Sequence, residues 1–379
     1  MKKTICILLC VSLLPLCGCG GIYENYRDVE RLLVVDTMGL DRIPGGVKLS
    51  YAASGTKKES APVLLSGTGE NIERASEQIR RLSFEEELFL KQTDCVLFGE
   101  EAAKSGLSEH LAYLCRSPDM RMDLPVYIVR EGEAAALMKE SGGEDRGISE
   151  ILRGIGDYLH GRGDGHGFTV REVESSLLKR DSALVCALKL SPSSEEDGEE
   201  AKTAEIDGYA VLKGGKLLTY LDREQAIGVG FLTGNTGVCS VTVRDPRGGS
   251  AEVRISSGSC QILPVWAEDG NLTGLQIRAQ VLADVTELHG GGSMSSSVYV
   301  RQLTGLLEET VAEKINAVLR LSAELRADLA GLSEAVERAT PEKYAKLTAP
   351  LEEILPTLET QVSVSAVLSH GNDLKGGTA

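Results

Sequence analysis

The chain has 379 residues, which is enough for two or three domains of ordinary size, and 42% of them are hydrophobic. Aromatic residues make up only 4%, so aliphatic side chains must fill the core. The formal net charge of −16 disfavours binding to nucleic acid and to acidic lipid surfaces, because their phosphate groups repel such a chain.

Residues 1–18 have the features of a lipoprotein signal peptide. A short basic region, Lys2-Lys3, precedes an apolar run from Thr4 to Leu16, which suits a signal core but is too short to span a bilayer as a stable helix. The run ends in Leu16-Cys17-Gly18-Cys19, the pattern of a bacterial lipoprotein cleavage site. We therefore predict cleavage before Cys19 and a lipid anchor on its thiol. The alternative interpretation is a plain secretory signal with chance cysteines.

Residues 19–190 are predicted to form an α/β region, because β-prone and helical segments alternate along it. Two β-prone segments flank a glycine-containing turn at 42–46, which predicts a hairpin. Thr169 and Glu172 form a capping box that opens a helix. Strands are expected at 30–41, 47–53, 61–65, 94–98, 124–129 and 182–190, and helices at 71–82, 102–114, 133–138 and 169–179. The glycine-rich and charged segment 141–167 is where two subdomains would separate.

The second half is predicted to be a separate domain, 206–371, behind an acidic linker at 191–205. Residues 275–285 and 360–368 alternate apolar and polar side chains, as half-buried strands do. Between them, apolar residues at helical spacing predict a long helix from about 298 to 326. We expect an antiparallel sheet packed on this helix, and for the whole chain a multi-domain α+β fold with mixed and antiparallel sheets.

Candidate sites for catalysis or metal binding are weak. His160 and His166 share a glycine-rich segment with Asp157 and Asp164, but nothing in that segment preorganises them as ligands. Gly67-Thr68-Gly69 lacks the third glycine and the lysine of a phosphate-binding loop. We therefore interpret all of them as structural or solvated residues.

The remaining candidates have structural interpretations too. Ser333 follows a predicted helix rather than a strand, so it fits a helix N-cap better than a nucleophile elbow. Trp266 is interpreted as a packing residue. The cysteines outside the N-terminal segment read as small buried hydrophobes: Cys95, Cys115, Cys186, Cys239 and Cys260. We expect no enzyme activity, catalytic residue, cofactor or metal ion.

Several motifs, in order along the chain, resemble the Ger(x)C family, the C-subunit lipoproteins of spore germinant receptors. Cys19 comes first, and Met38-Gly39-Leu40-Asp41 resembles the family's opening segment. The segment from Cys95 to Leu107, with Gly99-Glu100 after a strand, resembles the next one. Further matches lie at Arg116-Ser117-Pro118, 208–213, 221–224, Glu287, 327–332 and 341–344. The chain departs from the family pattern at Gly20-Gly21, where the family has Trp-Asp, and in the residues after Asp328, where aromatic residues are absent.

The resemblance implies a non-catalytic, membrane-anchored subunit on the outer face of the spore inner membrane. Its expected partners are the A and B membrane subunits of a receptor that responds to small nutrients. A solute-binding lipoprotein that delivers a ligand to a transporter is the alternative, although the sequence lacks two repeated α/β lobes. Whether this subunit itself contacts the nutrient stays open.

Overall fold

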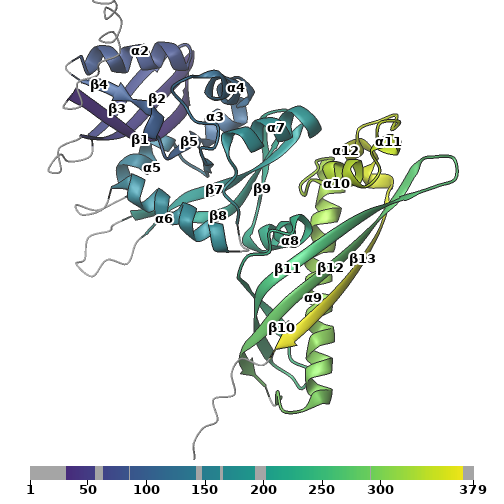
Figure 1. Ribbon diagram of the computed structural model, residues 1–379. Coiled ribbons are helices and arrows are strands. Elements are labelled where there is room, and N and C mark those ends of the chain that lie inside the picture. Colours follow the sequence, from purple (N-terminus) through teal and green to yellow (C-terminus); the bar gives the residue numbers. More distant parts are fainter. Residues whose placement is uncertain are drawn as a thin grey trace, which may run out of the picture.

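The computed structural model describes residues 31–55, 63–84, 86–141, 147–162, 165–192, 202–290 and 292–369. This part of the chain forms two β-sheets with helices packed on each, so the predicted α+β class is confirmed. The larger sheet takes its strands from residues 32–221 and the smaller one from residues 239–369. The two sheets lie in separate lobes of an elongated molecule (Figure 1).

The larger sheet has nine strands in the order β3-β2-β1-β5-β6-β7-β8-β9, with β4 also pairing with β1. They are β1 (Leu32–Ile43), β2 (Gly46–Gly55), β3 (Val63–Gly69), β4 (Glu87–Phe89), β5 (Cys95–Gly99), β6 (Val126–Val129), β7 (Ser182–Pro192), β8 (Lys202–Lys213) and β9 (Lys216–Leu221). The central strands β1, β5, β6 and β7 are parallel, and antiparallel strands extend both sides. The predicted hairpin is the pair β1–β2.

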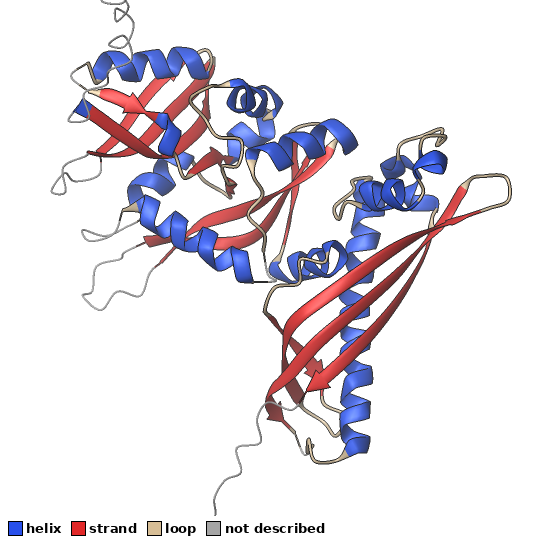
Figure 2. Cartoon of the chain, viewed as in Figure 1, coloured by secondary structure: helices blue, strands red, loops and turns tan. Residues whose placement is uncertain are grey.

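Helices cover both faces of this sheet (Figure 2). One face is covered by α2 (Ile72–Leu82), α3 (Glu100–Ser105), α4 (Ser108–Arg116) and α7 (Val170–Arg180). The other is covered by α5 (Ala134–Glu140), α6 (Ile148–Gly161) and α8 (Arg223–Thr233). A 3-10 turn, η3 (Leu90–Gln92), precedes β5. The predicted caps are present, since Asn71 accepts from the Arg74 N–H and Thr169 forms its capping box with Glu172.

Strand pairing crosses the expected border between the two domains. The strands on either side of the acidic run, β7 and β8, pair antiparallel in one sheet. Consequently β8 and β9, which we assigned to the second domain, belong to the larger sheet. Within 141–167, where we expected a subdomain break, the described residues form α6, whose buried Ile148, Leu152, Ile155 and Leu159 follow helical spacing.

The smaller sheet has the order β10-β11-β12-β13 and carries the long helix α9 on one face (Figure 1). Its elements are β10 (Cys239–Arg244), β11 (Ser250–Trp266), β12 (Leu272–His289), α9 (Ser297–Leu325) and β13 (Glu359–Ser369). The predicted long helix is confirmed, with Leu303, Leu307, Val311, Ile315 and Val318 all buried. Short helices complete this lobe: α10 (Leu332–Ala339), α11 (Pro341–Tyr344), α12 (Leu351–Ile354) and η4 (Leu355–Thr357).

One strand of the smaller sheet differs from the expected antiparallel arrangement. The pairs β10–β11 and β11–β12 are antiparallel, whereas β13 runs parallel to β12. The reason is the connection, because α9 carries the chain back along the sheet before β13 begins. A parallel neighbour needs such a crossover, whereas a tight turn can only produce an antiparallel one.

The helix α8 joins the two lobes. It packs against α9, and its Gly228 lies so close to α9 that an added Cβ would be 2.7 Å from the Lys314 carbonyl oxygen. Through α8 the core beneath the larger sheet continues into the core of the smaller one. The two halves are therefore packed on each other through apolar side chains.

Candidate functional site

Three acidic residues singled out by the motifs lie at the starts of helices. The Asp41 carboxylate is buried and accepts hydrogen bonds from the N–H groups of Ala134 (2.7 Å) and Ala135 (2.9 Å) at the first turn of α5. Burial raises the pKa of Asp41, although these two bonds oppose the change. Asp222 caps α8 through a capping box with Gln225. These acids hold helix N-termini in place and are not free for chemistry.

The third acid, Asp328, organises the turn between α9 and α10. Its side chain is fully buried and accepts hydrogen bonds from the N–H groups of Leu332 and Ser333, both at 2.8 Å, and of Ala330 at 3.3 Å. The Arg180 guanidinium of α7 lies 3.8 Å from the Asp328 carboxylate. Asp328 thus connects the start of α10 to the other lobe.

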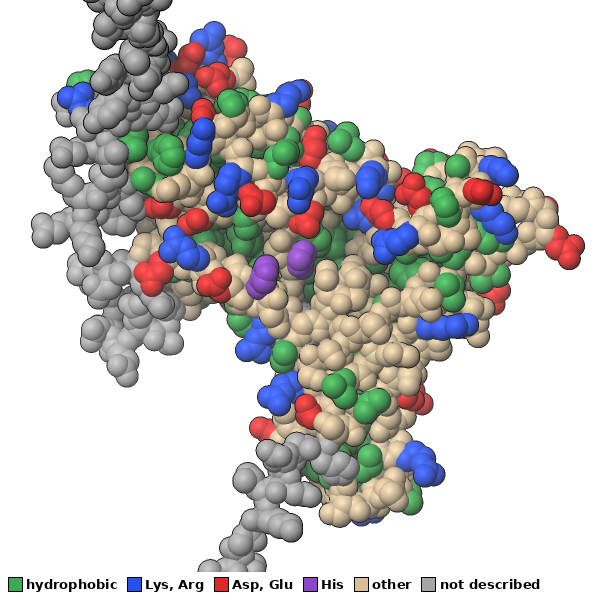
Figure 3. Space-filling view, viewed as in Figure 1, with side chains coloured by type: hydrophobic (Ala, Val, Ile, Leu, Met, Phe, Trp, Pro, Cys, Tyr) green, Lys and Arg blue, Asp and Glu red, His purple; other side chains and the backbone are tan. Residues whose placement is uncertain are grey.

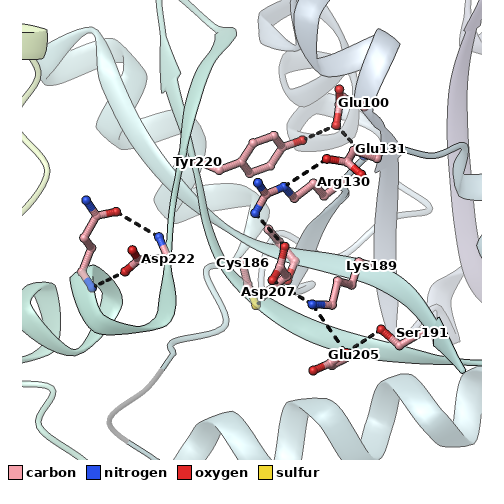
Figure 4. Close-up of polar contacts among 12 residues, drawn as sticks. Glu100, Arg130, Glu131, Cys186, Lys189, Ser191, Glu205, Asp207, Tyr220 and Asp222 are labelled. Carbon is pink, nitrogen blue, oxygen red and sulfur yellow. Dashed lines mark hydrogen bonds and ion pairs between the residues drawn. The ribbon is translucent and has the colours of Figure 1, made fainter. Parts of the chain in front are cut away.

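A polar network lies at the carboxyl ends of the parallel strands, where ligands bind in many open α/β sheets (Figure 4). Glu100, directly after β5, accepts a hydrogen bond from the Tyr220 hydroxyl (2.8 Å) and pairs with Lys104 (2.7 Å). The N–H of Glu131 also donates to the Glu100 carboxylate. Burial raises the pKa of Glu100, but these hydrogen bonds outweigh it, so the pKa lies below its usual range.

The other part of this network is centred on Arg130, directly after β6. Its guanidinium donates to Asp207 on β8 at 2.7 Å and stacks over the Tyr220 ring, with its Cζ 4.7 Å from the ring centre. Lys189 on β7 also donates to Asp207, at 3.2 Å. Figure 4 shows these side chains pointing toward one another across β6, β7, β8 and β9.

The geometry of the network fits a structural role, in which its charged side chains hold neighbouring strands together. Its acids and bases are paired with one another, and none of its described members places a nucleophile beside a free base. Sequence reasoning missed Arg130, Lys189, Asp207 and Tyr220. A signal for two of them exists, because Arg130 and Lys189 each follow an apolar run that the sequence predicts to be a strand.

The histidines and the glycine pair singled out from the sequence lie apart from this network. His160 is at the end of α6, and His166 packs edge-on against Phe168, with ring centres 4.8 Å apart. Among the described residues no group of three or more His, Cys, Asp or Glu side chains has metal-binding geometry. Gly67 and Gly69 belong to β3, where an added Cβ would contact the backbone of α2 at 2.5 Å. They let the helix approach the strand.

Ser333, Trp266 and the cysteines also have structural surroundings. Ser333 is the second residue of α10 and follows a left-handed glycine and Leu332, not a strand; the N-cap position belongs to Gly331 rather than to Ser333. Trp266 ends β11 under the Lys343 ammonium, 5.5 Å from the ring centre. The cysteines in the described part of the chain are free thiols, and Cys95, Cys186 and Cys239 are buried. The predicted lipidation site, Cys19, and also Asp164, lie outside the described residues.

Two protein-family models match nearly the whole chain. The first, a spore germination protein N-terminal domain, matches residues 25–189. The second, described as spore germination B3/GerAC-like, C-terminal, matches residues 207–371. The chain belongs to this spore germination family. The Ger(x)C resemblance drawn from the motifs is therefore confirmed.

A search of solved structures extends the likeness to the fold. The crystal structure of the GerBC protein matches with a TM-score of 0.57 and 17% identity, over 87% of this chain and 96% of that one. The comparison with curated proteins gives no match. No helix in the described part of this spore germination protein is long and apolar enough to span a membrane.

The family matches also give the polar network its place in the molecule. Glu100, Arg130 and Lys189 lie in the N-terminal match, whereas Asp207 and Tyr220 lie in the C-terminal match. The two matches meet between β7 and β8, in the middle of one sheet. The network therefore ties together the two parts that the family models separate.

Proposed function

We propose that this spore germination protein is the lipid-anchored C subunit of a nutrient germinant receptor and acts by binding, not by catalysis. The observation that carries the proposal is the pair of family matches, which follow one another over residues 25–371. The segment Leu16-Cys17-Gly18-Cys19 supports the lipid anchor on Cys19. The paired charges of the polar network support a role without a catalytic centre.

The proposed partners are the A and B membrane subunits of the receptor, on the outer face of the spore inner membrane. An anchor confines the protein to one membrane face and so raises its effective concentration for partners there. Such partners need only a modest intrinsic affinity. The acidic chain, with a net charge of −16, would gain little from direct adhesion to anionic lipid, which makes the covalent anchor the stronger attachment.

The anchor is tested by Cys19→Ala, with Cys17→Ala as the matched control. We expect Cys19→Ala to move the protein from the membrane fraction of spores to the soluble fraction, and Cys17→Ala to leave it in the membrane. Membrane retention of the Cys19→Ala protein that only detergent releases would contradict the lipid anchor.

The receptor role is tested in spores that lack the gene and any close paralogue. We expect the response to one group of nutrients to disappear and nutrient-independent germination to continue. A form that lacks residues 1–19 should restore the response poorly. Normal germination with every nutrient would refute the role, and a transport defect in growing cells would favour a solute-binding protein instead.

A further inference from the structure

A cleft of about 780 Å³ lies between the two lobes, away from the polar network. Its walls are α7 from the first lobe, α10 from the second, the middle of β11, and the residues after α8. In Figure 3, basic and acidic side chains gather on the surface where α7 and α10 approach each other. Clefts between packed domains are common places for a ligand or a partner segment.

The charge of this cleft is opposite to that of the whole chain. Three arginines line it, Arg171, Arg180 and Arg338, together with two glutamates. Both glutamates are engaged, since Glu172 belongs to the capping box of Thr169 and Glu334 accepts from Arg180 at 2.8 Å. A chain with a net charge of −16 therefore carries a locally basic cleft.

Two of the arginines are available to a ligand. Arg171 on α7 and Arg338 on α10 are exposed, and within the described part of the chain their side chains make no hydrogen bond or ion pair. Arg180 connects the two lobes and is already engaged, because its guanidinium pairs with Glu334. It also lies against Gly331, where an added Cβ would be 2.9 Å from the Arg180 Nη1 atom. Among the described residues, each lobe thus contributes one arginine to the cleft that can pair with a ligand, Arg171 from the first and Arg338 from the second.

The floor of the cleft is the edge of a strand. Four consecutive residues of β11, 260–263, line the cleft. Because successive side chains of a strand point to opposite faces of the sheet, all four can line one cleft only along the backbone edge of the strand. β10 pairs only with Ser250–Ile255. In the described part of the chain no strand pairs with residues 256–266 on that side. Their backbone groups are positioned to pair with an added strand.

We propose that this cleft binds an extended, acidic peptide segment of a partner protein, which adds a strand to the edge of β11 at 260–263 and pairs its carboxylates with Arg171 and Arg338. Backbone pairing supplies affinity in this mode of recognition, and side-chain contacts supply selectivity. Arginine is suited to carboxylates because its planar fork donates two parallel hydrogen bonds. The inference rests on the proposed function in one respect only, that the segment belongs to a receptor subunit.

The test uses fluorescent five-residue peptides and the purified protein without its signal segment. We expect a peptide of alternating glutamate and valine to bind saturably, and the same peptide with lysine in place of glutamate not to bind. Arg171→Gln and Arg338→Gln should each weaken binding about tenfold, the usual effect of losing a charge-assisted hydrogen bond. Arg320→Gln, an exposed position on α9 outside the cleft, should change nothing.

A second probe separates strand addition from simple charge attraction. Methylation of alternate backbone nitrogens of the acidic peptide removes N–H donors and keeps every side chain, so we expect binding to be lost. If the methylated peptide bound as tightly as the unmethylated one, strand addition would be overturned. The same holds if citrate, which has carboxylates but no peptide backbone, bound at this site as tightly as the peptide. Absence of saturable binding below about 1 mM would overturn the proposal as a whole. Neither result bears on membrane retention or on germination of the deletion strain, so failure of the two proposals is distinguishable.

Discussion

The two sheets of this protein are stabilised in different ways. The nine-stranded sheet has helices on both faces, with Tyr51 and Phe98 fully buried on one side and Tyr127 on the other. In the described part of the chain, one face of the four-stranded sheet is covered, by α9 and the short helices beside it, and the other is not (Figure 2). Loss of one helix in the first lobe leaves other helices on both faces of its sheet, whereas loss of α9 removes most of the cover of the second sheet.

The uncovered face of the smaller sheet has an unusual composition. In a chain with 25% charged residues, the exposed residues along β11, β12 and β13 on this face are mostly uncharged. The uncharged ones include Ser259, Gln261, Gln280, Leu282, Gln361, Ser363, Ser365 and Val367, and the charged ones are Arg254, Arg278 and Glu359. The second lobe therefore depends on α9 for its stability, and no described residue covers the other face of its sheet.

The largest expected effect is that of a charge placed beneath α9. Ile315 is fully buried, so Ile315→Asp loses its packing and buries a carboxylate without a partner. We expect the free energy of unfolding to fall by about 4 kcal/mol or more, measured by urea denaturation. Glu313→Ala, two residues away and exposed, should have little effect. Equal and small effects of both would mean that α9 does not form the core of this lobe.

The next effect concerns the junction of the lobes. Asp328→Ala leaves three buried N–H groups without their acceptor and removes the carboxylate beside Arg180. We expect a loss of about 2–4 kcal/mol, because a buried donor without a partner retains its full desolvation penalty. Glu337→Ala, exposed on the same helix α10, is the matched control. If the two variants unfold at the same urea concentration, Asp328 does not organise this turn.

The differences from the sequence predictions follow a physical pattern. Local signals succeeded: alternation predicted β12, helical spacing predicted α9, and Asn71 and Thr169 predicted helix starts. Two helices that contain glycines were not predicted, since Gly154 and Gly156 lie inside α6 and Gly228 and Gly230 inside α8. At Gly228 the helix α9 leaves no space for a side chain, and that requirement is set by tertiary packing rather than by local conformation.

Contacts between residues that are far apart in the sequence could not be predicted either. The parallel pairing of β13 depends on the path of α9, and the pairing of β8 with β7 depends on which strands become neighbours. In the polar network, Arg130 and Asp207 are 77 residues apart, so no local pattern joins them. The segments that carry the family resemblance contain Asp41, Glu100 and Asp222, but the sequence did not show that these acids serve as helix caps and network members.

A smaller effect is expected at the polar network, and it depends on pH. Glu100→Gln weakens the bonds from Lys104 and Tyr220, which we expect to cost about 1 kcal/mol at pH 7. The pKa of Glu100 is lowered in the folded protein, so its contribution is complete above about pH 4.5 and is lost as the pH falls through the folded value. The stability difference between wild type and variant should therefore shrink on acidification.

Asp41 changes the stability of the folded protein with pH in the opposite direction to Glu100. Burial raises its pKa in the folded protein, so its protonation on acidification favours the folded state. The Glu100 difference must consequently be taken between wild type and Glu100→Gln at each pH, since Asp41 contributes equally to both. A difference that grows below pH 4.5 would contradict the assignment of a lowered pKa to Glu100.

The smallest expected effect belongs to the uncovered face of the smaller sheet. Gln280 and Ser363 are both exposed there. The Ser363 hydroxyl donates a hydrogen bond to the Ile277 carbonyl at 3.3 Å, and this is the contact that a glutamate at position 363 would lose. Exposed substitutions away from caps and cores usually change stability by less than about 0.5 kcal/mol. We therefore expect Gln280→Glu and Ser363→Glu to unfold at nearly the wild-type urea concentration. A loss above about 1 kcal/mol from either, in the monomeric protein, would mean that this face is packed against something in solution, and the contrast between the two sheets would then be wrong.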